Sequence, residues 1–120
     1  MNKKDRQLVF EKTNGHCAYC GKELAKGWHL DHIKPIWRNN PTVNEAIRGT
    51  DTVDNAFATC PRCNNWKSVH SLERFREEIG KQGERLRRDS ASFRLAEDYG
   101  QVTEMKRKPV VFYFETMDSH

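Results

Sequence analysis

The stretch Asn55-Ala-Phe-Ala-Thr-Cys60-Pro-Arg-Cys63-Asn-Asn-Trp-Lys67 decides how this chain folds. Its first five residues form a short, mainly apolar run that predicts a strand leading directly into Cys60. Pro61 suits the first position of a helix, because its missing N–H would have no partner there. We therefore expect a strand followed at once by a helix, with two cysteines at the junction.

A second Cys-x-x-Cys pair lies earlier in the chain, at Cys17 and Cys20. Two such pairs are typical of one tetrahedral zinc site with four thiolate ligands. Zinc would close the long loop between the pairs and add folding free energy that a small core lacks. A redox role for either pair is the alternative, but neither lies in a βαβ pattern. We predict structural zinc, with the nearby His16 and His29 as ordinary surface or packing residues.

Length and composition bound the rest of the molecule. The 120 residues favour a single domain, and with 36% hydrophobic and 32% charged residues the buried apolar surface will be modest. A chain this polar benefits from a metal staple. The net charge of +4 and pI near 9.0 suit a polyanionic partner, although an ordinary solvated surface accounts for the charge equally well.

The sequence also indicates a compartment. Its first apolar run, Leu8–Phe10, is too short for the core of a signal peptide, and no later run is long enough to cross a bilayer. We expect a cytoplasmic protein with no membrane partner. Lasting disulfides are unusual in that compartment, which again favours metal ligation by the cysteines.

Patterns on both sides of the cysteine pairs predict further elements. Residues 3–14 favour a helix ending at Gly15, residues 28–33 a strand, and residues 38–54 a long polar loop. After the second pair, Ser71 is a good N-cap for a helix. Whether that helix continues through residues 85–88 is open.

The remaining elements lie near the C-terminus. Asp89 or Ser90 should cap a further helix that ends at Gly100. Residues 109–114, Pro-Val-Val-Phe-Tyr-Phe, give the strongest strand prediction in the chain. Left unpaired, such a strand would promote aggregation, so we expect it to join a sheet, dock on a helix or meet a partner.

Asp31-His32 ends the predicted strand at residues 28–33, between the two cysteine pairs. The ordinary interpretation is an aspartate paired with a nearby charge beside a partly exposed histidine. The position of Asp31-His32 between the cysteine pairs instead favours a functional site. Asn64 directly follows the fourth cysteine, and zinc would fix where the Asn64 side chain points. The strand end and the helix can then face each other across a small gap.

The run Trp28-His-Leu-Asp-His-Ile-Lys-Pro35, followed by residues 55–67, resembles the HNH endonuclease family. It is most similar to small four-cysteine members found in phages and prophages, and the matching motifs cover residues 17–67. The resemblance implies an α+β fold with a ββα-metal (His-Me finger) core. Around it we predict an N-terminal helix and a helical extension that ends in a strand. The predicted limits are one domain over 1–120, with the zinc-stapled core at 17–70 and the basic extension at 71–120.

The resemblance also implies a role for each motif residue. His32 would be the general base, taking a proton from the attacking water. Asp31 and Asn64 would bind one divalent ion, and the Asn55 amide would pin the loop that presents His32. The family name implies a final histidine where this chain has Asn64. An amide oxygen beside a carboxylate favours Mg²⁺ or Mn²⁺.

The implied activity is hydrolysis of DNA phosphodiester bonds, expected on the double-stranded form, giving 5′-phosphate and 3′-hydroxyl ends. Two alternatives stay open: a zinc-binding nucleic-acid-binding module without turnover, and an accessory subunit of a phage packaging or restriction complex. The expected setting is the cytoplasm of a bacterial host, with the gene carried by a phage.

Basic residues dominate after the second cysteine pair, and Arg85-Leu-Arg-Arg88 is the best cluster for phosphate contact. A solvated helix face balanced by nearby glutamates is nearly as good an interpretation. From these patterns, the predicted nucleic-acid contacts are Arg38, Arg62, Arg87 and Arg88. Lys67 is added because the resemblance implies that it lies near enough to stabilise a phosphate or the zinc thiolates.

Overall fold

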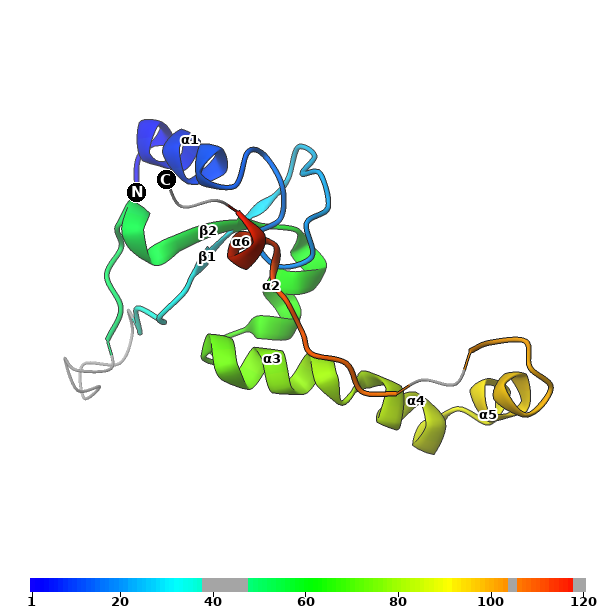
Figure 1. The fold of residues 1–120 in the computed structure, drawn as a ribbon. Helices are drawn as coiled ribbons and strands as arrows, with labels where there is room; N and C mark the ends of the chain where they lie inside the picture. The colour runs from blue at the N-terminus through cyan, green and yellow to red at the C-terminus, as the bar shows by residue number, and fades with distance from the viewer. Residues whose placement is uncertain (38–47, 104–105, 118–120) are drawn as a thin grey trace. The chain divides into compact units, whose positions relative to one another are not determined.

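The computed structural model describes residues 1–37, 48–103 and 106–117 of the chain (Figure 1). The chain divides into two compact units, Met1–Leu72 with Val111–His120, and Glu73–Val110. The predicted domain limits stay a prediction, because this division does not test whether either unit folds alone.

The first unit contains the predicted strand–strand–helix core. Strands β1 (His29–His32) and β2 (Ala56–Thr59) form a two-stranded antiparallel sheet, with His32 opposite Ala56. The 3-10 helix η2 (Val53–Asn55) precedes β2, and helix α2 (Pro61–Lys67) follows it. This arrangement, visible in Figure 1, is the small α+β fold with two strands and helices that the sequence predicts.

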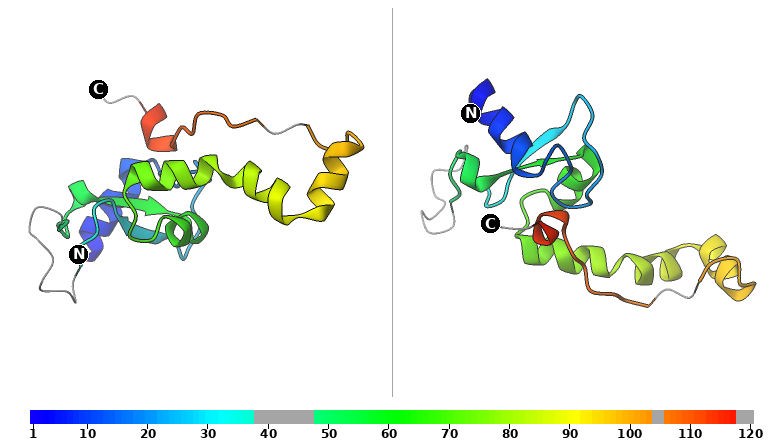
Figure 2. Two further views of the ribbon diagram at one scale, coloured as in Figure 1. Left: turned by 90° about the horizontal axis from the view of Figure 1, so that it is seen from below. Right: turned by 45° about the horizontal axis from the view of Figure 1, so that its top comes forward.

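Helix α1 (Lys3–Lys12) packs against β2, and both views of Figure 2 show it beside the sheet. The Asn2 side chain caps its start by accepting from the N–H of Asp5. At its end the N–H of Gly15 donates to the carbonyl of Phe10, with Gly15 at a φ of 73°, where glycine is favoured. The sequence places this helix end within two residues.

A small hydrophobic core lies between α1 and β2. Val9, Ala56 and Ala58 are fully buried there. Lys12 closes one side, because its ammonium donates to the carbonyl oxygens of Val53 and Ala56 at 2.8 and 2.7 Å. All four residues of β2 are buried, which explains why its sequence is a continuous run of small and apolar residues.

The junction between β2 and α2 forms as predicted. Pro61 is in the first turn of α2, and Cys60 is the N-cap residue. The Cys60 sulfur accepts a hydrogen bond from the N–H of Cys63 at 3.4 Å. One turn of chain therefore aims two sulfurs in one direction.

The strand predicted at residues 109–114 is wrong. Residues 109–112 are in neither strand nor helix, and a short helix, α6 (Tyr113–Thr116), follows. The N–H groups of Tyr113 and Phe114 donate to the carbonyls of Tyr19 and Ala18, at 3.0 and 2.8 Å, rather than to a neighbouring strand.

Aromatic packing explains this departure. Phe112 is buried and lies against Tyr19, with ring centroids 5.1 Å apart, while Phe114 lies 4.7 Å from Phe57. Phe112 and Phe114 thus pack on Tyr19 of the first cysteine loop and on Phe57 of β2, whereas Val111 between Pro109 and Phe112 stays exposed. Its composition favours a strand, but side-chain packing decides its conformation.

The second unit is helical. Helix α3 (Leu72–Gly80) begins directly after Ser71, α4 (Gln82–Asp89) occupies the stretch left open by the sequence, and α5 (Ala91–Asp98) follows. Of the two caps that the sequence offered, Asp89 and Ser90, it is Ser90 that caps α5, by accepting from the N–H of Phe93. Within the parts of the chain that are described, no helix is both long enough and apolar enough to cross a membrane.

Candidate metal centre and active site

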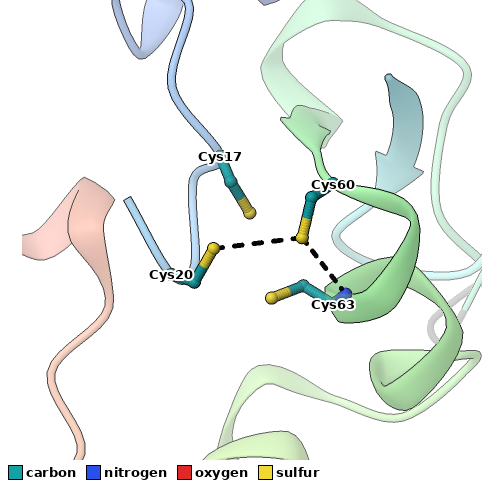
Figure 3. A group of neighbouring side chains, drawn as sticks. All are labelled: Cys17, Cys20, Cys60 and Cys63. Carbon is teal, nitrogen blue, oxygen red and sulfur yellow. Dashed lines mark hydrogen bonds between the residues drawn. The ribbon is translucent and has the colours of Figure 1, made fainter. Parts of the chain in front are cut away.

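The four cysteines come together at one point of the first unit. Figure 3 shows their sulfurs facing a common centre, from the first Cys-x-x-Cys loop and from the start of α2. All four sulfur atoms lie within 4.8 Å of one another, and those of Cys20 and Cys60 are 3.9 Å apart. Tetrahedral zinc, with Zn–S bonds of about 2.3 Å, separates its sulfurs by about 3.8 Å. The cluster therefore fits a structural zinc ion.

The pKa values of the cysteine thiols depend on one another because the sulfur atoms lie so close together. A hydrogen bond from the Cys63 thiol lowers the pKa of Cys17 to about 4, although burial opposes the shift. The same contact raises the pKa of Cys63, since a thiolate at Cys17 disfavours a second one beside it. One thiolate in the cluster therefore disfavours the others, and all four cysteines can be deprotonated together only when a metal ion compensates their charge.

The loop that carries Cys17 and Cys20 is a tight turn. The N–H of Gly21 donates to the carbonyl of Cys17 at 3.0 Å, with Gly21 at a φ of 79°. A Cβ on Gly21 would lie 2.9 Å from the Tyr113 ring. Glycine is therefore required here by the backbone conformation and by the close approach of the C-terminal segment.

Two of the predicted site residues, His32 and Asn64, line one surface pocket of the first unit. His32 ends β1, and Asn64 comes from the first turns of α2. The residues that line this pocket are Met1, Arg6, Trp28, His29, Leu30, His32, Asp51 and Asn64.

His32 contacts an acid that the sequence analysis did not select. Its Nε2 lies 2.8 Å from Oδ1 of Asp51, and the His32 side chain is 19% exposed. This hydrogen bond is the main reason why the pKa of Asp51 is below its usual value. The other Asp51 oxygen is 3.2 Å from the amino group of Met1.

Asn64 is held by His29. The amide nitrogen of Asn64 lies 3.0 Å from Nδ1 of His29, so the amide donates and the ring nitrogen accepts. The amide oxygen is the atom of Asn64 that remains for another ligand. His29, which its sequence position suggested was an ordinary surface or packing residue, lines the pocket.

Asn55 joins the two segments that flank the pocket. Its oxygen accepts from the N–H of Lys34, and its amide nitrogen donates to the carbonyls of Lys34 and Thr50, all at 2.8–2.9 Å. Gly49 comes so close that a Cβ there would lie 1.9 Å from the Lys34 oxygen. Only glycine fits this approach.

Asp31 lies apart from this pocket. It is buried, and its carboxylate accepts from the hydroxyl of Tyr19 at 2.6 Å and from the ammonium of Lys67 at 3.1 Å. Burial raises the pKa of Asp31, with Tyr19 and Lys67 opposing the shift. Successive side chains of a strand point to opposite faces, which explains why Asp31 and its neighbour His32 have different surroundings.

Lys67 does not present its charge to solvent, contrary to its predicted place among the nucleic-acid contacts. The side chain is fully buried, and its ammonium contacts Asp31 and the carbonyl of His32. A buried lysine is stable as a cation only beside a counter-ion, and Asp31 is that counter-ion.

The other predicted nucleic-acid contacts are distributed over the chain. Arg62 is exposed beside the cysteines, and the Cys63 sulfur raises its pKa. In the second unit, Arg87 makes two bonds to Glu97 at 3.0 and 2.9 Å, and Arg88 pairs with Asp89. Arg38 lies outside the described residues.

Together, the two-stranded sheet, the helix that follows it and the four-cysteine cluster define a ββα fold with a site that fits structural zinc. The sequence model of the HNH endonuclease family matches residues 17–69. These residues form an HNH endonuclease domain, and their four cysteines fit the small zinc-binding variant, which confirms the resemblance. Searches among curated proteins and among solved structures found no match.

The domain assigns a general function. HNH endonuclease domains are nuclease domains, so a metal site and DNA binding are expected of this region at the level of the family. The pocket also contains Arg6, His29 and Asp51, which sequence analysis did not select. Arg6 and Asp51 lie outside the conspicuous motifs, and no spacing rule pairs either of them with His32.

Proposed function

We propose that this protein is a metal-dependent DNA endonuclease that hydrolyses phosphodiester bonds and leaves 5′-phosphate and 3′-hydroxyl ends. One observation carries the proposal: His32 and Asn64, the first and last residues of the HNH motif, line the same pocket of a zinc-stapled ββα core. The pocket is open to solvent at His32, so a phosphate group of a bulky polymer could reach it.

His32 is the proposed general base. An unprotonated imidazole nitrogen takes the proton of the water that attacks phosphorus. Asn55 supports this role from behind, because its three hydrogen bonds fix the segments that flank the pocket. Arg6, exposed on α1 and 4.6 Å above the Trp28 ring, lines the pocket and is a suitable contact for a substrate phosphate.

Asn64, which lines the pocket, and Asp31, which does not, are the proposed protein ligands of one divalent ion, Mg²⁺ or Mn²⁺. An ion bound by both residues would compete with the contacts of Asp31 to Tyr19 and Lys67. When bound, such an ion neutralises charge that develops on the phosphate and on the leaving 3′ oxygen. The bond from the Asn64 amide nitrogen to His29 supports ligation through the amide oxygen. At Asp31 an ion would share the carboxylate with Lys67, whose ammonium already contacts both oxygens.

Plasmid cleavage in the presence of Mg²⁺ or Mn²⁺ tests the proposal. His32→Ala should reduce the rate by at least ~100-fold, the usual contribution of a general base, while zinc content and DNA binding persist. His70→Ala is the matched control, because His70 is a partly exposed histidine that does not line the pocket. Cleavage by His32→Ala at the wild-type rate would contradict the mechanism.

A second function is a zinc-stabilised DNA-binding module without turnover, acting within a phage packaging or restriction complex. The burial of Asp31 against Lys67 favours this alternative, because a paired carboxylate is less available to a metal ion. Retained zinc and DNA binding, with no nicked or linear product at any Mg²⁺ or Mn²⁺ concentration, would support the module over the nuclease.

A further inference from the structure

The contact between His32 and Asp51 joins two segments that are far apart in sequence. Asp51 lies 19 residues after His32, in the stretch that leads into η2, and the two side chains meet at 2.8 Å. Asp51 is not among the predicted zinc ligands, and it lies outside the sequence motifs that resemble the HNH family. Its carboxylate is nevertheless the acid that faces His32 in the pocket.

This contact fixes which nitrogen of His32 carries the proton. A carboxylate only accepts hydrogen bonds, so a neutral imidazole that bonds to it through Nε2 must carry its hydrogen there. The lone pair that can accept a proton is then on Nδ1. Without Asp51, the ring could adopt either tautomer and could rotate about its side-chain bonds.

The segment that carries Asp51 is itself held rigidly against the segment that follows β1. The Asn55 amide donates to the carbonyl of Thr50, the residue before Asp51. The N–H of Gly49 donates to the carbonyl of Pro35 at 2.7 Å. On the other side of Asp51, the N–H of Asn55 donates to the carbonyl of Thr52 at 3.0 Å, so hydrogen bonds hold the backbone both before and after Asp51.

We propose that Asp51 is a positioning residue for His32: it holds the imidazole with its proton on Nε2 and directs Nδ1 to the attacking water. Asp51 touches neither substrate nor metal in this role and acts on the reaction through His32, while its second oxygen contacts the amino group of Met1. The inference rests on the proposed nuclease function, since it assigns a partner to the general base of that reaction.

The direct test is the tautomer of His32, read from the ¹⁵N and ¹H NMR shifts of its ring in the zinc-loaded full chain. The wild type should show the Nε2–H form, Asp51→Ala should show a mixture or the other tautomer, and Asp51→Glu should recover part of the original signal. Asp54→Ala is the matched control, because it removes an exposed acid three residues away that does not line the pocket.

Cleavage kinetics supply the second readout. Asp51→Ala should lower kcat by ~10–100-fold, the usual cost of removing a residue that orients a reactive group, with KM and the Mg²⁺ requirement unchanged. Combined with His32→Ala, it should cause no further loss, because both changes remove the same function.

The outcomes separate this inference from the proposed function. An Nε2–H signal that survives Asp51→Ala would overturn the inference even if the protein cleaves DNA. A raised Mg²⁺ requirement in Asp51→Ala would also overturn it, because Asp51 would then be a metal ligand. If the wild type cleaves no DNA, the nuclease proposal fails. If, in addition, the His32 tautomer is the same in the wild type and in Asp51→Ala, the positioning role of Asp51 fails too.

Discussion

Each unit of the molecule contains an ion pair that joins two different secondary-structure elements, and the two pairs differ in burial. In the first unit, the Lys67 and Asp31 side chains are 0% and 5% exposed. In the second, the Arg87 and Glu97 side chains are 43% and 14% exposed. Water screens the second pair but not the first, so removing one partner has very different consequences. Burial, rather than the number of charge pairs, decides which of them the fold depends on.

The same difference extends to the whole of each unit. The first unit has a cysteine cluster, a small apolar core and a group of packed aromatic rings. In the second unit, Phe75 is the one buried residue among residues 73–103 and 106–110. That unit relies on helix caps and partly exposed ion pairs, which are weaker sources of stability.

The largest expected effect is from removal of zinc. A chelator, or Cys60→Ser, should unfold the first unit, because structural zinc contributes about 10–16 kcal/mol of apparent binding free energy to folding. All three tryptophans, Trp28, Trp37 and Trp66, belong to this unit, so their fluorescence reports its unfolding alone. Re-addition of zinc should restore the signal. An unfolding midpoint that is the same with and without zinc would contradict a structural role for the metal ion.

Loss of Lys67 should have the next largest effect. Lys67→Met leaves Asp31 as a buried charge without its counter-ion and should lower the free energy of unfolding by about 3–5 kcal/mol. Urea unfolding followed by tryptophan fluorescence measures this. The double variant with Asp31→Asn should recover most of the loss, and Lys22→Met, at an exposed lysine, should cost little. A Lys67→Met protein with the same free energy of unfolding as the wild type would contradict the claim that the fold depends on the buried pair more than on the exposed pair.

The smallest effect is expected at the exposed pair. Arg87→Gln should destabilise α4 and α5 by about 1 kcal/mol at most, with less effect at high salt, because the Arg87 side chain remains accessible to water. Hydrogen exchange of the α4 and α5 amides measures the change. A loss as large as that from Lys67→Met would show that burial is not what distinguishes the pairs.

Local sequence signals predicted the core of the fold well. The strand before Cys60, the helix starting at Pro61, the cap at Ser90 and the end of α1 near Gly15 all agree with the structure. Each depends on interactions within a few residues, such as a cap, a turn glycine or a proline. The spacing of the cysteines was enough to predict the cluster, because four thiols in two tight turns favour a shared metal ion.

Predictions failed where partners come from distant parts of the chain. Residues 109–114 have the composition of a strand, but their N–H groups find carbonyls in the first cysteine loop. Lys67 carries the positive charge expected of a phosphate contact, but its side chain is buried against Asp31. Neither outcome is visible in sequence, since both depend on which surfaces the fold brings together.

The sequence by itself determined the strand–helix junction and the cysteine cluster, because these depend on short spacing and local geometry. The roles of His32 and Asn64 rest on the resemblance to the HNH family and stay a prediction. Only the tertiary structure decided that Asp51 faces His32, that His29 holds Asn64, and that Lys67 neutralises Asp31. Each of these pairs joins residues 19 to 36 positions apart. Hydrogen bonds over such separations exist only after folding has closed the loops between them.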